Sequence, residues 1–286
     1  MEQQLLSRSE ATKRTLVSLT NRTCAKSGSN RCVLPLGRAL ACGDLKLQGD
    51  WGPDSEIISG GSPSQDVWFI RSGILRLQRH SYDGRRQILS LFFPGEIVGF
   101  EGEFRDGVSV ETATQSSLCR IDRRRFHSLV NENDGLRAEL FRQKQDQLDR
   151  LHWLTWSLGA LSPEERLCAF LAVCSKVMPF QPLGDGSGIL SVLLSRKDIA
   201  DLLGTTVESI SRIVHRLSEA GLIEIRSPAH FRLLDLPGLV RLGHIDGLFD
   251  GMTLGIMKRL SRLEALVAPT SGDSVCFCGR QSGPLT

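Results

Sequence analysis

The sequence predicts an α+β protein with two folded parts joined by a long helix. Three observations support this class. Residues 44–126 hold short apolar stretches separated by Gly, Pro and Asp, which is typical of β-strands connected by turns. Residues 134–158 repeat leucine at three- and four-residue steps, the period of an amphipathic helix. Residues 162–235 then combine short helices that have recognisable caps with a strand, a turn and a second strand.

The composition is that of an ordinary globular protein. Of the 286 residues, 41% are hydrophobic and 23% are charged. No uninterrupted apolar run approaches the roughly 18 to 20 residues that a membrane helix needs. The beginning of the chain is polar and lacks the apolar segment of a secretory signal. We therefore expect a cytoplasmic protein without a membrane partner.

Charge alone does not predict nucleic-acid binding. Lys and Arg number 35 against 32 Asp and Glu, so the net charge is only +3 and any DNA contact must come from a local surface. Residues 1–43 form one basic stretch, which has seven Lys or Arg and two acidic residues. This segment predicts a basic, cysteine-containing N-terminal arm.

The part from residue 44 to residue 133 predicts a small antiparallel β-roll or barrel. Apolar and polar residues nearly alternate around Leu75 and Leu77, as they do in a half-buried strand. Asp83 and Gly84 indicate a hairpin, because both residue types tolerate positive φ. Pro94 and Gly95 follow the next strand, where a roll would turn a corner.

The range 134–160 predicts one long helix. Its apolar stripe consists of Leu136, Leu140, Leu148, Leu151, Leu154 and Leu158. About 25 residues at about 1.5 Å each exceed the length that a small roll can cover. We expect this helix to form the seam of a homodimer; the alternative is a helix that lies on its own domain.

The range 161–242 predicts a helix-turn-helix followed by a β-hairpin wing. Ser162 caps one helix, and Ser195 caps the next, which ends at Gly204. The following helix begins at Thr205 or Thr206. Its predicted buried stripe is Ile210, Ile213, Val214 and Leu217.

The opposite face of this second helix carries groups that suit base recognition. Arg212 matches the O6 and N7 acceptors of guanine, Glu208 matches the N4 amine of cytosine, and Ser211 makes a smaller contact nearby. The other predicted DNA-binding residues are Thr206, Ser209, His215, Arg216 and Arg196. In the wing, the residues placed to touch phosphates are Arg226, His230 and Arg232.

Two other functions are weighed against DNA binding. A winged helix also serves as a protein-binding module, in which Glu208 and Arg212 would be a surface ion pair. The alternative function is therefore an effector-binding regulatory module that acts through protein-protein contacts. An enzyme is not expected, because the sequence has no nucleophile-base spacing, phosphate-binding Gly loop or His-rich metal motif.

The stretch "LSRKDIADLLGTTVESISRIVHRLSEAGLI" closely resembles the helix-turn-helix of the CRP/FNR family of bacterial transcription regulators. The resemblance extends through "SPEERLCAFL", "SSLCRIDRRRF" and "DGRRQILSLFFPGEIVG" and covers roughly residues 44–242. It implies a cyclic-nucleotide-binding-type β-roll, a dimerisation helix and a C-terminal winged helix-turn-helix. It also implies a homodimer that binds double-stranded DNA and, as an activator, contacts RNA polymerase.

The motif "VESISR" is similar to that of the FNR and FixK branch of the family. The catabolite-activator branch has an additional Arg before the Glu, where this chain has Val207. The resemblance therefore implies a TTGAT-like half-site, read twice as an inverted repeat. It also implies a link to oxygen limitation or redox metabolism.

The resemblance leaves the sensed signal open. In relatives that bind cAMP, a Glu follows the Gly that corresponds to Gly99, and an Arg-Ser pair holds the phosphate. This chain has Phe100 in place of the Glu and Asp106-Gly107 in place of the pair, so cAMP is not expected. FNR proteins hold an iron-sulfur cluster on four cysteines, and the candidate ligands here are Cys24, Cys32, Cys42 and Cys119. Asn21 stands where another ligand is expected. FixK-type relatives work without a cluster, and Cys119 is then a small buried residue.

Residues 243–286 extend beyond the resemblance. An amphipathic helix is expected at 252–267, followed by a polar segment that contains Cys276 and Cys278. One residue between two cysteines is a weak metal signal, and a pair of free thiols is the favoured interpretation. The sequence assigns no role to this extension.

Overall fold

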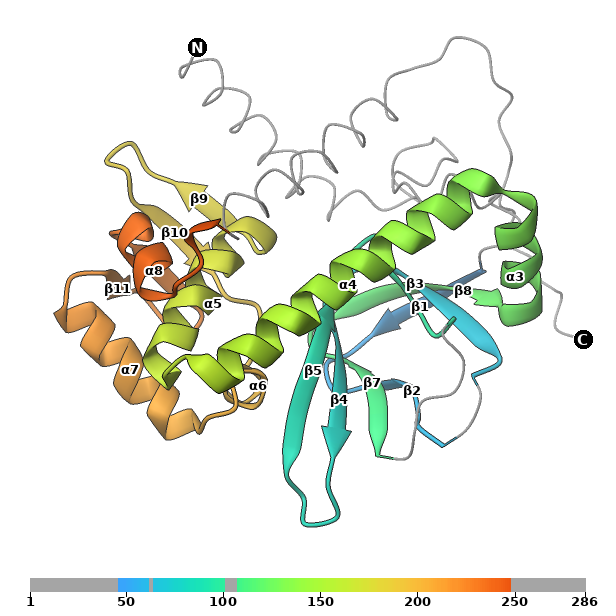
Figure 1. Cartoon of the computed structure of the whole chain (residues 1–286), viewed down its shortest axis with the longest axis horizontal. Coiled ribbons are helices and arrows are strands. Elements are labelled where there is room, and N and C mark those ends of the chain that lie inside the picture. Colours follow the sequence, from blue (N-terminus) through green and yellow to red (C-terminus); the bar gives the residue numbers. More distant parts are fainter. Residues whose placement is uncertain (1–45, 62–63, 101–106, 248–286) are drawn as a thin grey trace, which may run out of the picture.

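The computed structural model describes residues 46–61, 64–100 and 107–247. The predicted basic arm and nearly all of the C-terminal extension lie outside these residues. A β-rich part and a helix-rich part lie at the two ends of one long helix, α4 (Figure 1). This arrangement is the α+β fold that the sequence predicts.

The β-rich part consists of two four-stranded antiparallel sheets. The first has the order β1-β8-β3-β6, with bounds Lys46–Trp51, Ser116–Asp122, Asp66–Ser72 and Ile97–Val98. The second has the order β2-β7-β4-β5, with bounds Glu56–Ile58, Val108–Thr112, Leu75–His80 and Arg86–Phe92. Apolar side chains from both sheets, among them Ile70, Leu75, Val110 and Leu118, form one buried cluster. The predicted β-roll is therefore confirmed.

Two turns of the roll behave largely as expected. Strands β4 and β5 form a hairpin around Asp83 and Gly84, although only Gly84 has a positive φ, of 82°. Gly95 has a φ of 93°, and its amide donates to the carbonyl of Ile70 at 2.9 Å. A residue with a Cβ rarely adopts this backbone conformation, so glycine is the natural choice at both turns.

Helix α3, Arg123–Glu132, is not predicted by the sequence pattern. It follows β8 directly, and the side chain of Asp122 accepts a hydrogen bond from the amide of Arg125 at its start. Its apolar stripe, Phe126, Leu129 and Val130, spans little more than one helical turn, so it is too short to reveal the helix in the sequence.

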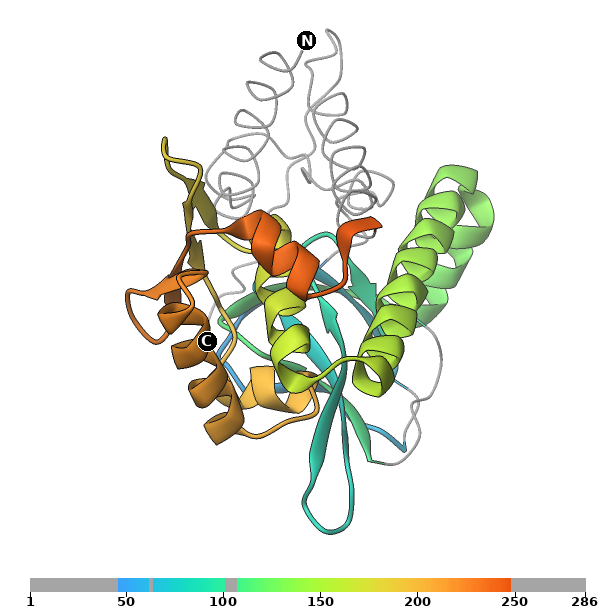
Figure 2. The ribbon, with the colours of Figure 1, turned by 60° about the vertical axis from the view of Figure 1, so that its left-hand side comes forward.

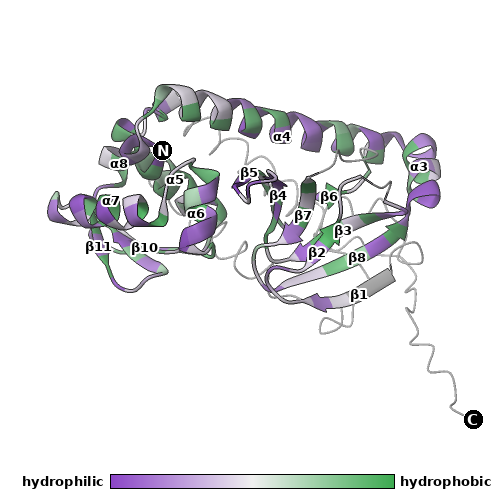
Figure 3. Ribbon diagram, turned by 90° about the horizontal axis from the view of Figure 1, so that it is seen from below, coloured by the Kyte–Doolittle hydropathy of each residue, from purple (hydrophilic) through white to green (hydrophobic). Residues whose placement is uncertain are grey.

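Helix α4, Asp134–Ala160, occupies the residues for which the sequence predicts a long helix. Its inner face lies on the roll, where Leu136 is buried and Gln143 bonds both the amide and the carbonyl of Ile97, at 3.0 and 2.7 Å. Its outer face exposes Phe141, Leu148, Leu151 and Trp156. The predicted single stripe of leucines is therefore divided, with Leu136 and Leu154 buried and Leu148 and Leu151 exposed. Figure 3 shows α4 running beside both parts.

The helix-rich part is a winged helix. Its helices are α5 Pro163–Val177, α6 Arg196–Leu202, α7 Val207–Glu219 and α8 Leu236–Leu242. Its sheet has the order β11-β12-β10-β9, with bounds Ile223–Ile225, His230–Leu233, Gly188–Ser191 and Phe180–Pro182. Strand β9 has three residues, which are too few to show an alternating pattern in the sequence.

Helix α5 begins as the sequence predicts. The hydroxyl of Ser162 accepts from the amide of Glu165, and the carboxylate of Glu165 accepts from the amide of Ser162 at 2.7 Å. This reciprocal pair satisfies two amides that have no partner inside the helix. Arg166, one residue later, donates to the carbonyls of Leu158 and Leu161 at 3.2 and 2.9 Å, so it ties the end of α4 to α5.

One apolar cluster spans both parts of the molecule. Ile74 and Ile88 of the roll and Leu154 of α4 belong to the same buried cluster as the core of the winged helix. Gly204, between α6 and α7, lies against the end of α4: its φ is +60°, and a Cβ there would be 2.8 Å from Cδ2 of Leu158. The helix-turn-helix is therefore packed directly on α4 and on the roll.

We predict that Gly204→Ala lowers the free energy of unfolding by about 2 kcal/mol. A side chain at positive φ costs about 1 kcal/mol, and the added methyl group also overpacks the contact with Leu158. Urea denaturation followed by circular dichroism measures the change.

Gly221→Ala is the matched control. Gly221 has a similar φ of +72°, but a Cβ there would meet no atom within 4 Å. Gly221→Ala should therefore lose only the free energy that a side chain costs at positive φ. Equal losses in the two variants would show that the contact between Gly204 and Leu158 contributes nothing.

Candidate nucleic-acid interface

Local hydrogen bonds fix the turn between α6 and α7. The amide of Thr205 donates to the carbonyl of Ala200 at 3.0 Å, and the positive φ of Gly204 reverses the chain between them. The hydroxyl of Thr206 then accepts from the amide of Ser209 at 3.1 Å. Of the two predicted caps, Thr206 is therefore the one that starts α7.

Helix α7 has one buried face and one exposed face. The predicted apolar stripe is confirmed, since Ile210, Ile213, Val214 and Leu217 are each at most 3% exposed. The side chains on the other face are all exposed, namely Glu208, Ser211, Arg212, His215 and Arg216. Figure 2 shows α7 at the outer edge of the winged helix. Burial of one stripe therefore presents the polar face outward.

The three side chains predicted to read bases differ in the hydrogen bonds that they already make. The pKa of Glu208 is lowered by hydrogen bonds from its own backbone amide and from Thr206, and further by the charge of Arg212, so this carboxylate is an acceptor only. The hydroxyl of Ser211 donates to the carbonyl of Val207 at 3.0 Å, which leaves its oxygen as an acceptor. Arg212, one helical turn after Glu208, supplies donors on the same face.

Several other predicted DNA-binding residues are engaged within the protein. The guanidinium of Arg196 lies 5.0 Å from the ring centre of Phe231, and burial lowers its pKa. Arg216 pairs with Glu164 of α5, with Nε and Oε2 3.0 Å apart. Ser209 is half-buried beside Thr206 and takes part in the cap. DNA contact by these residues stays a prediction.

The wing residues predicted to touch phosphates are also held by neighbours. Arg232 donates to the hydroxyl of Ser187 at 2.9 Å and pairs with Asp185. Arg226 pairs with Glu224 at 3.0 Å, and the imidazole of His230 lies 2.8 Å from the hydroxyl of Ser227. These contacts order the hairpin. Arg226 and His230 are exposed and keep further donors for a phosphate, whereas Arg232 is half-buried.

The candidate cluster ligands are mostly outside the described residues. Cys24, Cys32 and Cys42 lie in the undescribed N-terminal segment, and Cys119 is half-buried on β8 against the cluster that contains Phe126. Over the described ranges, no three metal-binding side chains come together. Cys168 and Cys174 are buried in the winged-helix core. Burial raises the pKa of Cys168 to about 12, which makes it an inert thiol.

The position after Gly99 is occupied by an aromatic ring. The ring of Phe100 lies 5.9 Å from that of Phe126 and 4.5 Å from the amine of Lys144, so it joins the roll to α3 and α4. Asp106 lies outside the described residues. The roll therefore presents no carboxylate at the position where cAMP-binding relatives have a Glu.

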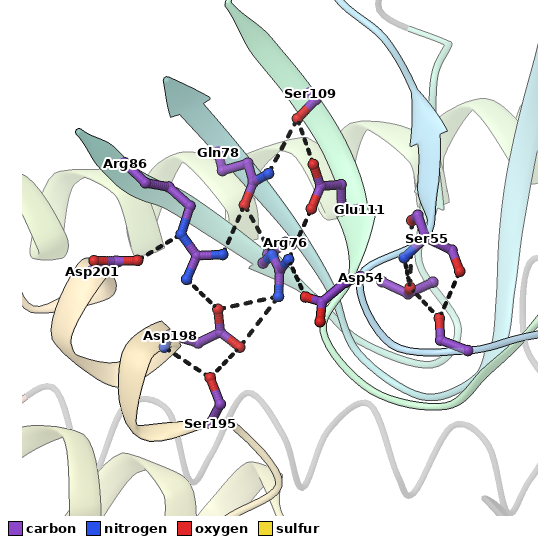
Figure 4. A network of polar contacts seen from close by, with 12 residues as sticks. Asp54, Ser55, Arg76, Gln78, Arg86, Ser109, Glu111, Ser195, Asp198 and Asp201 are labelled. Atoms are coloured by element: carbon purple, nitrogen blue, oxygen red, sulfur yellow. Dashed lines mark hydrogen bonds and ion pairs between the residues drawn. The ribbon is translucent and has the colours of Figure 1, made fainter. Parts of the chain in front are cut away.

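The structure contains a buried polar network that the sequence does not predict. It joins Arg76 and Arg86 of the roll to Asp198 and Asp201 of α6 (Figure 4). Charged residues on short strands usually face solvent, and these partners are more than 100 residues apart in the chain. No local pattern could have revealed them.

Comparison with known proteins agrees with this architecture. Residues 50–133 match the family model described as a cyclic nucleotide-binding domain, and residues 165–242 match that of a Crp-like helix-turn-helix domain. The transcriptional regulatory protein btr of Bordetella pertussis is 32% identical over 63% of this chain and 74% of its own. The nitrogen fixation regulation protein FixK of Rhizobium meliloti is 31% identical over 63% of this chain and 80% of its own.

A solved structure has the same fold. The structure of FixK2 from Bradyrhizobium japonicum covers 69% of this chain and 96% of its own, with a TM-score of 0.61 and 22% identity. The fold, the exposed face of α7 and these relatives define a transcription regulator that binds DNA through its helix-turn-helix. The chain belongs to the CRP/FNR family and is FixK-like. As the relatives are regulators, it is not an enzyme.

None of the helices between residues 46 and 247 that the structure describes combines the length and the apolar character needed to cross a membrane.

We predict that Thr206→Ala lowers the free energy of unfolding by about 1 kcal/mol, because the amide of Ser209 loses its capping acceptor at the start of α7. Urea denaturation gives the value. Thr205→Ala, one residue before the cap, is the control and should cost less. A larger loss in the control would show that the cap has been assigned to the wrong threonine.

Proposed function

We propose that this protein is a homodimeric transcription activator that reads a TTGAT-like inverted repeat with α7 of each subunit. The observation that carries this proposal is the exposure of Glu208, Ser211 and Arg212 on one face of the N-terminal half of α7. An α-helix fits the major groove, and residues near its N-terminus reach the base edges.

The chemistry of this face suits the proposed half-site. Arg212 is matched to guanine by two parallel hydrogen bonds, and Glu208 accepts from the amine of cytosine on the opposite strand. Val207, 37% exposed at the first position of α7, is an apolar group suited to a thymine methyl. Each contact distinguishes its base from the alternatives in the major groove.

The proposed dimer uses the outer face of α4. This face exposes Phe141 by 70%, Leu148 by 44%, Leu151 by 42% and Trp156 by 46%. Such a row of large apolar side chains costs free energy in water, and a second copy of α4 would cover it. The inner face meanwhile lies on the roll, so the helix covers its own domain and leaves only the outer face for the proposed dimer.

A two-fold dimer presents two copies of α7 in opposite directions. An inverted repeat has the same symmetry, and each half-site would receive one helix. The reading of DNA would therefore depend on the dimer.

The biological setting is proposed from the relatives. FixK of Rhizobium meliloti is named for the regulation of nitrogen fixation, and a relative from Haemophilus influenzae, 27% identical over 65% of this chain, is named an anaerobic regulatory protein. We accordingly place this regulator in the cytoplasm, in the control of oxygen-limited or redox-linked metabolism. Activation would require contact with RNA polymerase.

We predict that Arg212→Ala weakens binding to a TTGAT inverted repeat by about 1 to 3 kcal/mol, or roughly 5- to 150-fold, and relaxes the preference for guanine at one position. Fluorescence anisotropy with the cognate and base-substituted duplexes measures both effects. Arg137→Ala, at the far end of α4, removes the same charge as a control and should bind like the parent.

A salt titration of the parent protein separates this proposal from the alternative of a module that docks on protein. Binding that neutralises several phosphates weakens steeply as salt rises. A flat salt response, or unchanged affinity of the Arg212→Ala variant, would contradict DNA reading by this face of α7.

We predict that Leu148→Glu converts the dimer to a monomer and lowers affinity for the inverted repeat at least tenfold, because the substitution buries two carboxylates in the seam. Sedimentation velocity measures the assembly state. Gln181→Glu adds the same charge at an exposed residue of β9 and should leave the dimer intact. A dimeric Leu148→Glu variant would exclude this face as the seam.

A further inference from the structure

A buried polar network connects the outer face of the roll to the first helix of the helix-turn-helix (Figure 4). Its centre is Arg76 of β4, which is 2% exposed, and Asp198 of α6, which is also 2% exposed. Nη1 of Arg76 lies 3.1 and 3.2 Å from the two carboxylate oxygens of Asp198. Both carboxylate oxygens of Asp198 therefore accept from the same charged nitrogen of Arg76.

A second arginine on the neighbouring strand holds the same helix. Nη2 of Arg86 lies 2.7 Å from Oδ1 of Asp198, and its Nε lies 2.5 Å from Oδ2 of Asp201. The hydroxyl of Ser195 donates to Oδ2 of Asp198 at 2.9 Å. The two aspartates of α6 are therefore fixed by groups on β4, on β5 and on the helix cap.

Residues within the roll aim Arg76 at α6. Its Nη2 donates to Asp54 at 2.6 Å and to Glu111 at 2.8 Å, while its Nε donates to the side chain of Gln78 at 2.9 Å. Burial alone would lower the pKa of Arg76, but these hydrogen bonds and carboxylates raise it, so the guanidinium stays charged. These contacts orient the guanidinium of Arg76 toward Asp198.

Apolar contacts accompany the network along the same helix. Ile74 and Ile88 of the roll pack into the core of the winged helix, and the side chain of Gln87 donates to the carbonyl of Leu202 at 3.3 Å. Gly204, at the end of α6, lies against Leu158 of α4. Helix α6 is thus held from its cap to its last turn, and α7 is packed on α6.

A buried ion pair contributes little net stability compared with apolar residues of the same shape, but loss of one partner leaves an uncompensated charge. Such a network therefore favours one arrangement of the two parts over others. The reading face of α7 remains exposed in this arrangement, so these contacts do not cover the proposed DNA-binding residues.

We propose that Arg76, Arg86, Asp198 and Asp201 form an interdomain latch, which fixes the orientation of the helix-turn-helix with respect to α4. This inference rests on the proposed function, in which two subunits read an inverted repeat. With the latch closed, the two copies of α7 have a fixed separation. The latch residues are therefore positioning residues that determine which spacing between half-sites the dimer accepts, although they contact no base.

The test compares the parent with the double variant Arg86→Gln/Asp201→Asn, which removes both ion pairs of Arg86, with Asp198 and with Asp201, and leaves neutral amides in their place. Each protein is titrated with TTGAT inverted repeats whose central spacers differ by one base pair, and with a single half-site. The parent should prefer one spacer by at least tenfold. The variant should lose most of this preference, while its affinity for the single half-site stays within about twofold.

The matched control is Arg85→Gln/Asp83→Asn, which removes an ion pair of 2.9 Å at the tip of the same hairpin, where the two side chains are 87% and 56% exposed. It should keep the spacer preference of the parent. Asp198→Asn is the more severe variant, and urea denaturation of each protein shows whether it is folded. A folded latch variant with the parent's spacer preference would overturn the proposal, and so would tighter binding to every spacer.

Hydrogen exchange gives a readout that needs no DNA. In the latch variant, the amides of α6 and β5 should exchange faster than in the parent and in the control variant. Unchanged exchange in a folded variant would overturn the latch. If the parent binds none of the repeats, the proposed DNA sequence is wrong, and hydrogen exchange alone then decides the latch.

Discussion

The burial of apolar side chains in one continuous cluster is the constraint on which the arrangement of the molecule depends. Ile74 and Ile88 of the roll enter the same cluster as Leu154 of α4 and Ile210 of α7. The winged helix therefore cannot turn against the roll without exposing apolar surface to water. Because α7 contributes one face to this cluster, its other face must be polar and outward. The placement of the groups that we propose to read bases follows from the packing of the core.

Helix α4 meets two different requirements on two faces. Its inner face bonds the roll through Gln143 and buries Leu136 and Leu154, whereas its outer face exposes Phe141 and Leu148. A helix that only covered a domain would be polar on the outside. The outer apolar row therefore needs its own explanation, which the proposed dimer provides. The same helix also ends at the winged part, where Arg166 bonds its last carbonyls.

The extent to which the sequence predicts this structure depends on how local the signal is. The cap at Ser162, the buried stripe of α7 and the span of α4 are predicted because each rests on neighbours within a few turns of helix. Helix α3 is missed because its apolar stripe spans little more than one turn, and β9 is missed because three residues show no period.

The same difference between local and long-range signals applies to the candidate site. The exposed face of α7 follows from helical periodicity, so Glu208, Ser211 and Arg212 could be placed together from the sequence. The contact between Arg196 and Phe231 could not be predicted, because the ring comes from a strand 35 residues later and only the folded wing brings it close. Partners such as Arg76 and Asp198 are invisible for the same reason.

The length of α4 gives small movements a large effect. Its 27 residues span about 40 Å at about 1.5 Å each. A tilt of about 5° at one end of such a lever displaces the other end by about 3.5 Å, which is close to the rise of about 3.4 Å between successive base pairs. A helix of this length therefore converts a change of a few degrees in its tilt into a displacement of about one base-pair step.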